Sequence, residues 1–530
     1  MSDSSFDIIE TPLGLQHKGY ILHLYIKNEH IMKRLYNLLA CVLVGAFAIS
    51  CEYGAMMDGV YYPEMDGAAM PEEGEPDPGE GDRFDEIKDN AFIKTSEQNV
   101  STFSIDADGA AYGYMRRMIS SGQLPYKSSV RIEEYLNYFT FKYDDPTGDH
   151  TVAINSEVGP CPWNEEHLLM RLGLKGKPMD LNQAPAANFV FMVDVSGSMD
   201  SDDKLGLLKS CLTTLVDNLR PTDRVSIITY ASKVEKLIGS TPASEAKKIK
   251  NAISKLNARG STAGGEAMKM AYEEALENFI EGGNNRVIMG TDGDFNVGVT
   301  STDALLEMVQ DYADKGIYLT VCGFGTGNLN DSMMETISNK GNGTYQYIDS
   351  ELEMVKVFVH ENSKFYSVAN DTKVQVTFDP EKVDSYRLIG YENRVMSNED
   401  FENDNKDAGE IGAGQTITAL YEIIPVGEAY ADRQLAVFDV RYKKALGTES
   451  LLLTENVHEF KAPKSDRKEL SFAAGVAAFG MILRDSEYKG TADFDMAYEL
   501  IGKGLDNDPH GYRAELQELI NTAKGISFKQ

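Results

Sequence analysis

The hydrophobic pattern of this chain is most regular between Phe189 and about residue 360, where short apolar runs alternate with amphipathic stretches. A continuous apolar run is typical of a strand covered on both faces, and strands that alternate with helices indicate a parallel sheet. The runs that predict strands are FVFMVD, RVSIITYA, RVIMGTDGD and IYLTVCGFG, and the predicted helices include KLGLLKSCLTTLVDNL and EAMKMAYEEALENFI. We therefore expect a Rossmann-like α/β domain over residues 186–360, with helices on both faces of a parallel sheet.

Strands of another kind are predicted on both sides of this domain. TVAINSEV and LLMRLGL precede it, and KVQVTF, TITALYEI, LAVFDVRY and SLLLTE follow it. Their alternation of apolar and polar residues is typical of half-buried antiparallel strands. We expect both groups to form one β-sandwich into which the α/β domain is inserted. The last part of the chain predicts helices, whose charged residues bracket too few apolar residues for a membrane span.

The amino terminus has the layout of a targeting signal. Residues 1–31 have no useful periodicity, but Met32 begins MKRLYNLLACVLVGAFAISC, in which two basic residues precede a short apolar stretch. This is the layout of a signal peptide, and the stretch is short for a membrane span. Its end, AISC, resembles a bacterial lipoprotein lipobox, although Ala48 stands where leucine is commonest. That resemblance implies lipid modification of Cys51 and an anchor in the cell envelope, at the outer membrane; the alternative is a plain uncleaved anchor.

Composition narrows the class of protein. With 530 residues the chain is expected to form at least two domains, and a net charge of -32 argues against nucleic acid as a partner. No GxGxxG opens the first helix of the α/β domain, so nucleotide binding has no support. The acidic, Pro/Gly-rich stretch after Cys51 predicts a disordered tether. Cys161, Cys211 and Cys322 are expected to be buried free thiols.

Oxygen-bearing side chains stand where the predicted strands end. Asp194, Ser196 and Ser198 follow FVFMVD, Thr262 lies in the turn GSTAGG, and Asp292 ends RVIMGTD. Ligands of open α/β sheets bind at the carboxyl ends of the strands, so these side chains are expected to converge at one edge. Hydroxyls, carboxylates and water suit Mg²⁺, and zinc is disfavoured without histidine or cysteine. Simple helix capping by the two serines would account for neither of the other loops.

Together these motifs resemble the metal-ion-dependent adhesion site (MIDAS) of von Willebrand factor type A domains. The resemblance implies that Ser196, Ser198 and Thr262 bind the metal directly or through water, and that Asp194 and Asp292 hold those waters. It also implies that the remaining metal position accepts an exposed Asp or Glu of a protein partner. Mg²⁺ is the expected ion, with Mn²⁺ and Ca²⁺ open as alternatives.

The flanks extend the resemblance to a bacterial von Willebrand factor A lipoprotein family. Residues 99–139 resemble its N-terminal leader segment, and residues 386–423 resemble its C-terminal domain of unknown function. The leader departs from the usual pattern at Ala107 and Gly109, and we interpret Asp106 and Asp108 as helix caps. The expected organisation is an upstream extension (1–31), a lipoprotein signal peptide (32–51), a disordered acidic tether (52–90), the family N-terminal segment (91–148), sandwich strands (149–185), the A domain (186–360), further sandwich strands (361–462) and a C-terminal helical region (463–530).

Catalytic signals are missing from the sequence. No histidine lies in a recognisable catalytic motif, DVSGS is not a GxSxG elbow, and neither a second metal nor a positioned base is visible. We therefore expect no enzyme activity. Two functions stay open: an envelope lipoprotein that binds a protein partner through the metal, or an assembly or regulatory subunit in which the A domain is an interaction scaffold. Neighbouring genes for an ATPase or further A-domain proteins would favour the second.

Overall fold

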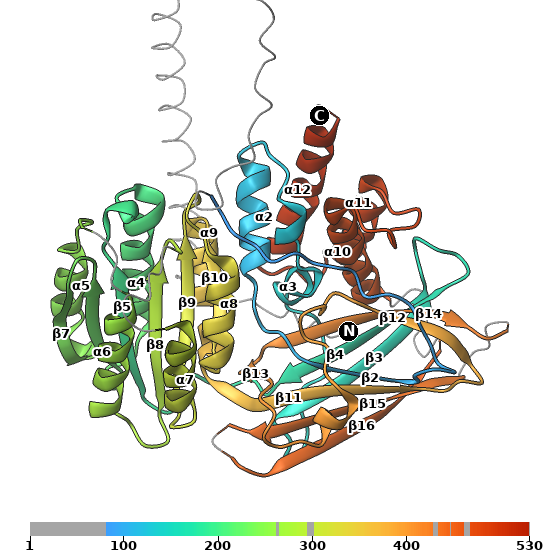
Figure 1. Ribbon diagram of the computed structural model, residues 1–530, viewed down its shortest axis with the longest axis horizontal. Helices are drawn as coiled ribbons and strands as arrows, with labels where there is room; N and C mark the ends of the chain where they lie inside the picture. Colours follow the sequence, from blue (N-terminus) through green and yellow to red (C-terminus); the bar gives the residue numbers. More distant parts are fainter. Residues whose placement is uncertain are drawn as a thin grey trace, which may run out of the picture. The chain divides into compact units, whose positions relative to one another are not determined.

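The computed structural model describes residues 81–260, 264–293, 301–427, 433–445, 447–459 and 467–528 (Figure 1). The chain divides into two units, Met1–Glu75 and Pro76–Gln530, and all described residues belong to the second. The upstream extension, the signal peptide and Cys51 lie outside the described residues. Within the described part, no helix combines the length and the apolarity that crossing a membrane requires.

Residues 81–90, which composition assigns to the disordered tether, are ordered: the stretch begins against the A domain, and Asp89 and Asn90 at its end bond to Arg484 and to the carbonyl of Gly390, respectively. The Asp82 carboxylate accepts hydrogen bonds from the backbone N–H groups of Gly327 (2.6 Å) and Leu329 (3.0 Å), and the Tyr114 hydroxyl donates to it at 3.0 Å. The backbone of Arg83 also bonds to Leu329. The acidic composition of this stretch therefore reflects specific pairing as well as solvation.

The A domain is built on a six-stranded sheet in the order β10-β9-β8-β5-β6-β7. Its strands are β5 (Ala187–Asp194), β6 (Arg224–Tyr230), β7 (Val234–Pro242), β8 (Asn284–Thr291), β9 (Ile317–Phe324) and β10 (Thr344–Ile348). The predicted strands pair in parallel, whereas β7 is an antiparallel edge strand that the sequence analysis missed. Its mixed, half-exposed sequence VEKLIGSTP carries little apolar signal.

Helices cover both faces of this sheet. They are α4 (Leu207–Asn218), α5 (Ala246–Ser254), α6 (Gly264–Glu277), α7 (Thr302–Ala313), α8 (Asp331–Lys340) and α9 (Glu351–Val355). Along β5, Phe189 and Phe191 pack with α4 and α5, whereas Val190 and Met192 pack with α6, α7 and α8. Because successive strand residues point to opposite faces, a strand buried on both must be apolar throughout. The predicted fold class is confirmed.

The flanking strands form two antiparallel sheets. One has the order β1-β12-β14-β4-β3; the other has the order β13-β11-β15-β16, with β2 also paired to β11. The strands are β1 (Ile93–Lys94), β2 (Val100–Ser104), β3 (Val152–Pro160), β4 (Leu168–Gly176), β11 (Ser367–Phe378), β12 (Val383–Ile389), β13 (Gly409–Gly412), β14 (Thr416–Pro425), β15 (Gln434–Lys444) and β16 (Ser450–His458). Strand β4 precedes the A domain and pairs with β14 after it, so the A domain is an insertion in this sandwich.

The central strands of the first sheet are buried on both faces, although the sequence predicts half-buried strands. On β14, Ala419 and Tyr421 lie in the core between the two sheets, while Leu420 packs into a helical core on the outer face. Leu169 on β4 also faces that helical core. Strand β16, in contrast, alternates exposed and partly buried residues as predicted.

The helical core joins the N-terminal segment to the end of the chain. It is formed by α2 (Ala110–Ser120), α3 (Ile132–Asn137), α10 (Lys468–Arg484), α11 (Phe494–Gly502) and α12 (Tyr512–Ser527). Helix α10 is buried along nearly its whole length, and a Cβ at Gly475 or Gly480 would come within 3 Å of isoleucine side chains. Glycine is therefore required for this close packing. The three cysteines outside the signal sequence are buried free thiols, as predicted.

Three arginines form buried ion pairs at the contacts between the N-terminal segment, the A domain and the sandwich; we call these pairs the junction network, in which Arg131 and Arg394 share Glu335 and Arg116 has its own carboxylates. Arg116 of α2 bonds to Asp349 and Glu353 of the A domain and to Glu515 of α12. Arg131 bonds to Glu134 (3.1 Å), Asp331 (2.6 Å) and Glu335 (2.8 Å). Arg394, which follows β12, bonds to Asp106 (3.0 Å) and Glu335 (3.2 Å). The network ties three parts of the chain together.

The interpretation of Asp106 and Asp108 as helix caps is wrong. The N-cap of α2 is Gly109, and no side chain caps it. Asp106 instead pairs with Arg394, and Asp108 accepts a hydrogen bond from the backbone N–H of Tyr345 at 2.7 Å. Both carboxylates are nearly fully buried. The free-energy cost of removing their charges from water is compensated by a tertiary partner such as Arg394.

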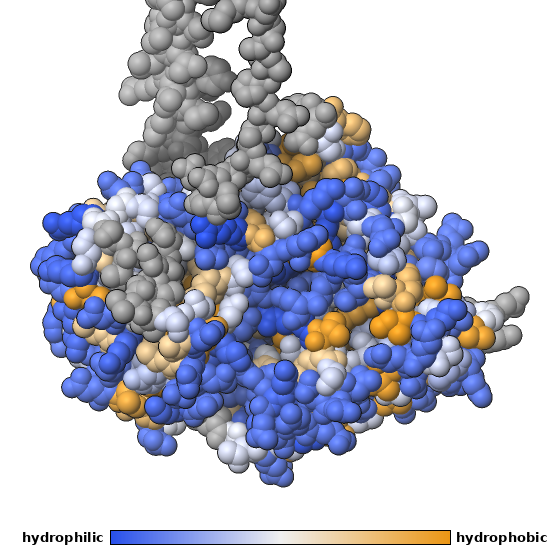
Figure 2. All heavy atoms as spheres, viewed as in Figure 1, coloured by the Kyte–Doolittle hydropathy of each residue, from blue (hydrophilic) through white to orange (hydrophobic). Residues whose placement is uncertain are grey.

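One face of the outer surface is mostly polar (Figure 2). The face drawn in Figure 2 is mostly hydrophilic, and its apolar residues lie in small separate groups.

Candidate metal site

Two of the predicted site residues lie at the ends of neighbouring parallel strands. Asp194 is the last residue of β5, and Asp292 follows directly after β8. The two strands pair with Val193 opposite Gly290, so both carboxylates reach the same edge of the sheet. The chain continues from β5 to β6 on one side and later returns to β8 on the other, which makes the end of β5 the switch point where ligands of such sheets bind.

The turn after β5 brings the two serine hydroxyls together. The Oγ atoms of Ser196 and Ser198 are 3.0 Å apart. Asp194 Oδ1 accepts a hydrogen bond from the backbone N–H of Ser196 at 2.8 Å, and its Oδ2 accepts one from the Thr291 hydroxyl at 3.2 Å. The Asp194 carboxylate therefore fixes the turn that presents both serines.

The second loop of the motif is tied to the same turn. The N–H of Gly197 donates to the carbonyl of Gly260 at 2.9 Å, and the N–H of Arg259 donates to the carbonyl of Val195 at 2.7 Å. Thr262 lies outside the described residues. After Asp292, Gly293 adopts a φ of +97°, and a Cβ there would lie 2.6 Å from the backbone nitrogen of Asn330. Glycine is therefore required in the turn that carries Asp292.

Burial dominates the electrostatics of Asp194. Desolvation raises the pKa of this carboxyl to about 6, hydrogen bonds from Ser196 oppose the rise, and the nearby Asp292 adds to it. A cation bound nearby would stabilise the ionised form of Asp194 and lower its pKa.

A lysine that the sequence analysis missed supplies one positive charge at this edge. Lys204 Nζ donates to Asp292 Oδ2 at 2.9 Å, and both side chains are largely buried. Lys204 lies in the short π-helix Asp202–Gly206, and its methylene groups pass over Gly325, where a Cβ would lie 2.3 Å from the lysine chain. In the sequence it stands in DSDDKLGL at the start of a predicted helix, so only its spacing from the serines could have indicated a role.

The donor set fits a hard divalent cation. Asp194, Ser196, Ser198 and Asp292 offer carboxylate and hydroxyl oxygens, which Mg²⁺ prefers, with water completing its shell. Among the described residues, no group of three or more His, Cys, Asp or Glu side chains could hold a metal ion. Half of the described donors of the candidate site are serine hydroxyls. The site therefore differs from metal sites built of three or more His, Cys, Asp or Glu side chains.

Three family models match the chain. The model described as "von Willebrand factor" matches residues 78–171, and the "von Willebrand factor type A domain" model matches residues 188–360. The model described as "Uncharacterized protein YfbK, C-terminal" matches residues 363–526. The matched regions correspond to the N-terminal segment with β3 and the start of β4, the A domain, and the later sandwich strands with the C-terminal helices.

Similar proteins include the "Uncharacterized protein YfbK" of Escherichia coli K12, which is 37% identical over 471 residues, covering 84% of this chain and 81% of that protein. Among solved structures, a von Willebrand factor type A protein from Catenulispora acidiphila is 15% identical with a TM-score of 0.40, covering 69% of this chain and 89% of that one. Proximal thread matrix protein 1 of the mussel byssus, solved with a zinc-occupied MIDAS motif, is 25% identical with a TM-score of 0.28, covering 33% of this chain and 44% of that one.

Proposed function

Because this chain belongs to the YfbK family and carries a von Willebrand factor type A domain, we propose that it binds a protein partner through a divalent cation held at the candidate metal site. Domains of this type typically mediate protein interactions, sometimes through a MIDAS. The observation that carries the proposal is the meeting of Asp194, the paired Ser196 and Ser198 hydroxyls, and Asp292 at one sheet edge.

The charges at this edge support a carboxylate as the partner group. Counted from the sequence, the negative charges at the site are those of Asp194 and Asp292, which together balance a divalent ion. Lys204 offsets one of these two charges, so a bound divalent cation retains net positive charge. That residual charge attracts an Asp or Glu side chain of a partner. We propose Mg²⁺ rather than the zinc of the mussel protein, because none of the donors is histidine or cysteine.

The test separates metal binding from partner binding. Envelope proteins captured by the full chain in Mg²⁺ should be released by EDTA. Ser196→Asp puts a charged ligand beside the metal, so it should keep Mg²⁺, measured by calorimetry, and lose the captured partner. Ser210→Asp adds the same charge on the exposed side of α4 and should capture the partner normally. Capture that survives EDTA, or that Ser196→Asp leaves intact, would contradict the proposal.

The location proposed for this protein is the cell envelope, at the outer membrane, through a lipid on Cys51. The support is sequence-based: small residues precede Cys51 at the end of a signal-like stretch. Cys51→Ser should release the protein into the soluble fraction, whereas Cys41→Ser, within the apolar stretch, should leave it with membranes. Retention of Cys51→Ser in the membrane fraction would contradict the anchor.

The proposed role is binding rather than catalysis. Four of the described histidines have structural partners among the described residues: His150 contacts the Tyr442 hydroxyl, His167 contacts the Glu422 carboxylate, and His360 stacks on His510.

A further inference from the structure

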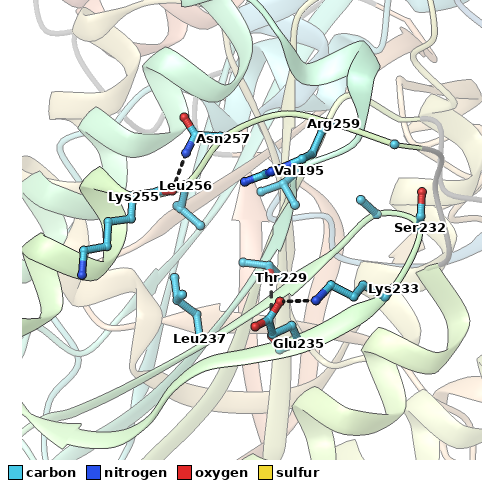
Figure 3. Close-up of a pocket in the computed structure, with 12 residues that line it drawn as sticks. Val195, Thr229, Ser232, Lys233, Glu235, Leu237, Lys255, Leu256, Asn257 and Arg259 are labelled. Atoms are coloured by element: carbon cyan, nitrogen blue, oxygen red, sulfur yellow. Dashed lines mark hydrogen bonds and ion pairs between the residues drawn. The ribbon is translucent and has the colours of Figure 1, made fainter.

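A pocket of about 430 Å³ opens beside the turn that carries the two serines (Figure 3). Its apolar lining includes Val195, Leu237 and Leu256. The β6–β7 hairpin forms one wall, and the segment after α5 forms the other. This volume lies in the range of ligand pockets, and the site is large enough for one or two side chains of a bound peptide.

The charged residues of this pocket are mainly basic. Lys233 forms an ion pair with Glu235 at 3.0 Å, so its charge is compensated. Lys255 and Arg259 are exposed, and no described carboxylate pairs with either side chain. In Figure 3 Arg259 extends beside Val195, Lys233 points toward Glu235, and Lys255 points away from Arg259 at the rim of the pocket. We call the cavity with Lys255 and Arg259 the basic pocket. Two cations without a carboxylate partner among the described residues are a strong local feature on a chain of net charge -32.

The basic pocket shares its wall with the candidate metal site. Val195, which lines the pocket, stands between Asp194 and Ser196. The backbone of Arg259 bonds to Val195, and Gly260, another lining residue, bonds to Gly197 between the serines. A partner segment that reaches the metal therefore passes the mouth of the pocket within a few residues.

We infer that the basic pocket selects the partner of the proposed function: a peptide segment with two acidic residues, one for the metal and a second for Arg259, with Lys255 adding positive charge at the rim. The inference rests on the proposed metal-dependent binding. The apolar floor suits the methylene groups of a glutamate or an adjacent aliphatic side chain, and the Arg259 guanidinium suits its carboxylate. Charge complementarity of this kind fixes register and partner choice more than raw affinity.

The test uses a library of random short peptides displayed on phage and selected against the full chain. Selections are run on wild type in Mg²⁺, on wild type in EDTA, and on the double variant Lys255→Gln/Arg259→Gln in Mg²⁺. The control variant is Lys247→Gln, which removes an exposed charge from α5 outside the pocket. The peptide most enriched by wild type is then titrated against every variant by fluorescence anisotropy.

We expect wild type to enrich two acidic residues at a fixed spacing and the double variant to enrich one. The double variant should bind the selected peptide about tenfold more weakly, while Lys247→Gln binds it as wild type does. Replacing the second acidic residue of the peptide by its amide should weaken wild type but not the double variant. Equal binding by wild type and double variant would overturn the basic pocket as a selector.

The same selections separate this inference from the function on which it rests. A peptide bound equally in EDTA but lost from the double variant would overturn metal-dependent binding and leave the basic pocket as the recognition surface. No enrichment by wild type in Mg²⁺ would overturn both.

Discussion

The candidate metal site and the junction network are both clusters of buried carboxylates, but they differ in their positive partners. In the junction network, Arg116, Arg131 and Arg394 each bond to carboxylates from different parts of the chain. At the metal site, Asp194 is held by hydrogen bonds from neutral groups, and Lys204 pairs with Asp292. The first cluster is compensated mainly by the protein itself; the second has room for an added cation.

This difference explains why one cluster is structural and the other is a candidate site. Arginine presents several N–H donors in a fixed plane and can bond to more than one carboxylate. The junction network therefore stabilises a fixed arrangement of the three parts. The metal site combines carboxylates with hydroxyls, which are weak partners for a charge unless a metal or water joins them.

The largest expected effect is the loss of a central arginine from the junction network. Arg131→Met leaves Asp331 and Glu134 without a buried counterion and leaves Glu335 with Arg394 alone, so the free energy of unfolding should fall by about 3–5 kcal/mol. Chemical denaturation at neutral pH measures it. Arg117→Met is the control, because Arg117 pairs with the half-exposed Asp203 and its loss should cost about 1 kcal/mol or less. Equal losses in both variants would contradict the structural role given to the buried ion pairs of Arg131.

A smaller effect is expected at Glu133, a buried carboxylate near the network to which none of its arginines bonds. Burial, with repulsion from Glu392 and Asp106, raises the pKa of Glu133 to about 8. The native state therefore holds the proton that the unfolded state loses above its lower pKa. The contribution of Glu133 to stability is complete at acid pH and is lost as the pH rises toward 8.

Glu133→Gln should remove this pH dependence. Between pH 5 and pH 8 the wild type should lose about 2–4 kcal/mol of unfolding free energy that the variant keeps. Denaturation at the two pH values measures the change, and Arg394 and Arg484, whose charges act on Glu133, stay intact. Parallel pH profiles of wild type and variant would contradict the raised pKa of Glu133.

The smallest of these effects concerns Lys204. Lys204→Met removes the positive charge beside Asp292, so Mg²⁺ should bind about tenfold more tightly, while an acidic peptide should bind the loaded site more weakly. Isothermal titration with Mg²⁺ measures the first change. Lys269→Met on α6 removes an exposed charge and should leave Mg²⁺ affinity unchanged. Weaker Mg²⁺ binding in Lys204→Met would mean that the lysine organises Asp292 rather than opposing the metal charge.

Strand and helix types in the A domain could be predicted because periodicity reports local burial. The run FVFMVD predicts β5 correctly, since every residue of that strand is buried. Two-sided burial of β14 could not be predicted from TITALYEI, whose threonines resemble an exposed face. Thr418 is in fact fully buried and bonds to the Tyr143 hydroxyl and to the side chain of Asn137.

The candidate site could be assembled from the sequence only where its residues end strands. Asp194 and Asp292 follow apolar runs, and the parallel register brings them to one edge. Lys204 has no such signal, because its role depends on a π-helical turn that carries the side chain back to Asp292. Likewise, the pairing of Asp106 with Arg394 joins residues 288 positions apart, and no local pattern marks it.

The most direct test of the account is the effect of Mg²⁺ on the stability of single variants of the site. A ligand that binds only the native state stabilises it by about 3 kcal/mol at a hundredfold excess over its Kd. Denaturation with and without Mg²⁺ should give such a rise for wild type. Ser198→Ala, Thr262→Ala and Asp292→Ala should each lose most of it, whereas Ser210→Ala on α4 should retain it. A rise of the same size in all variants, or none in wild type, would contradict a divalent cation held by these residues.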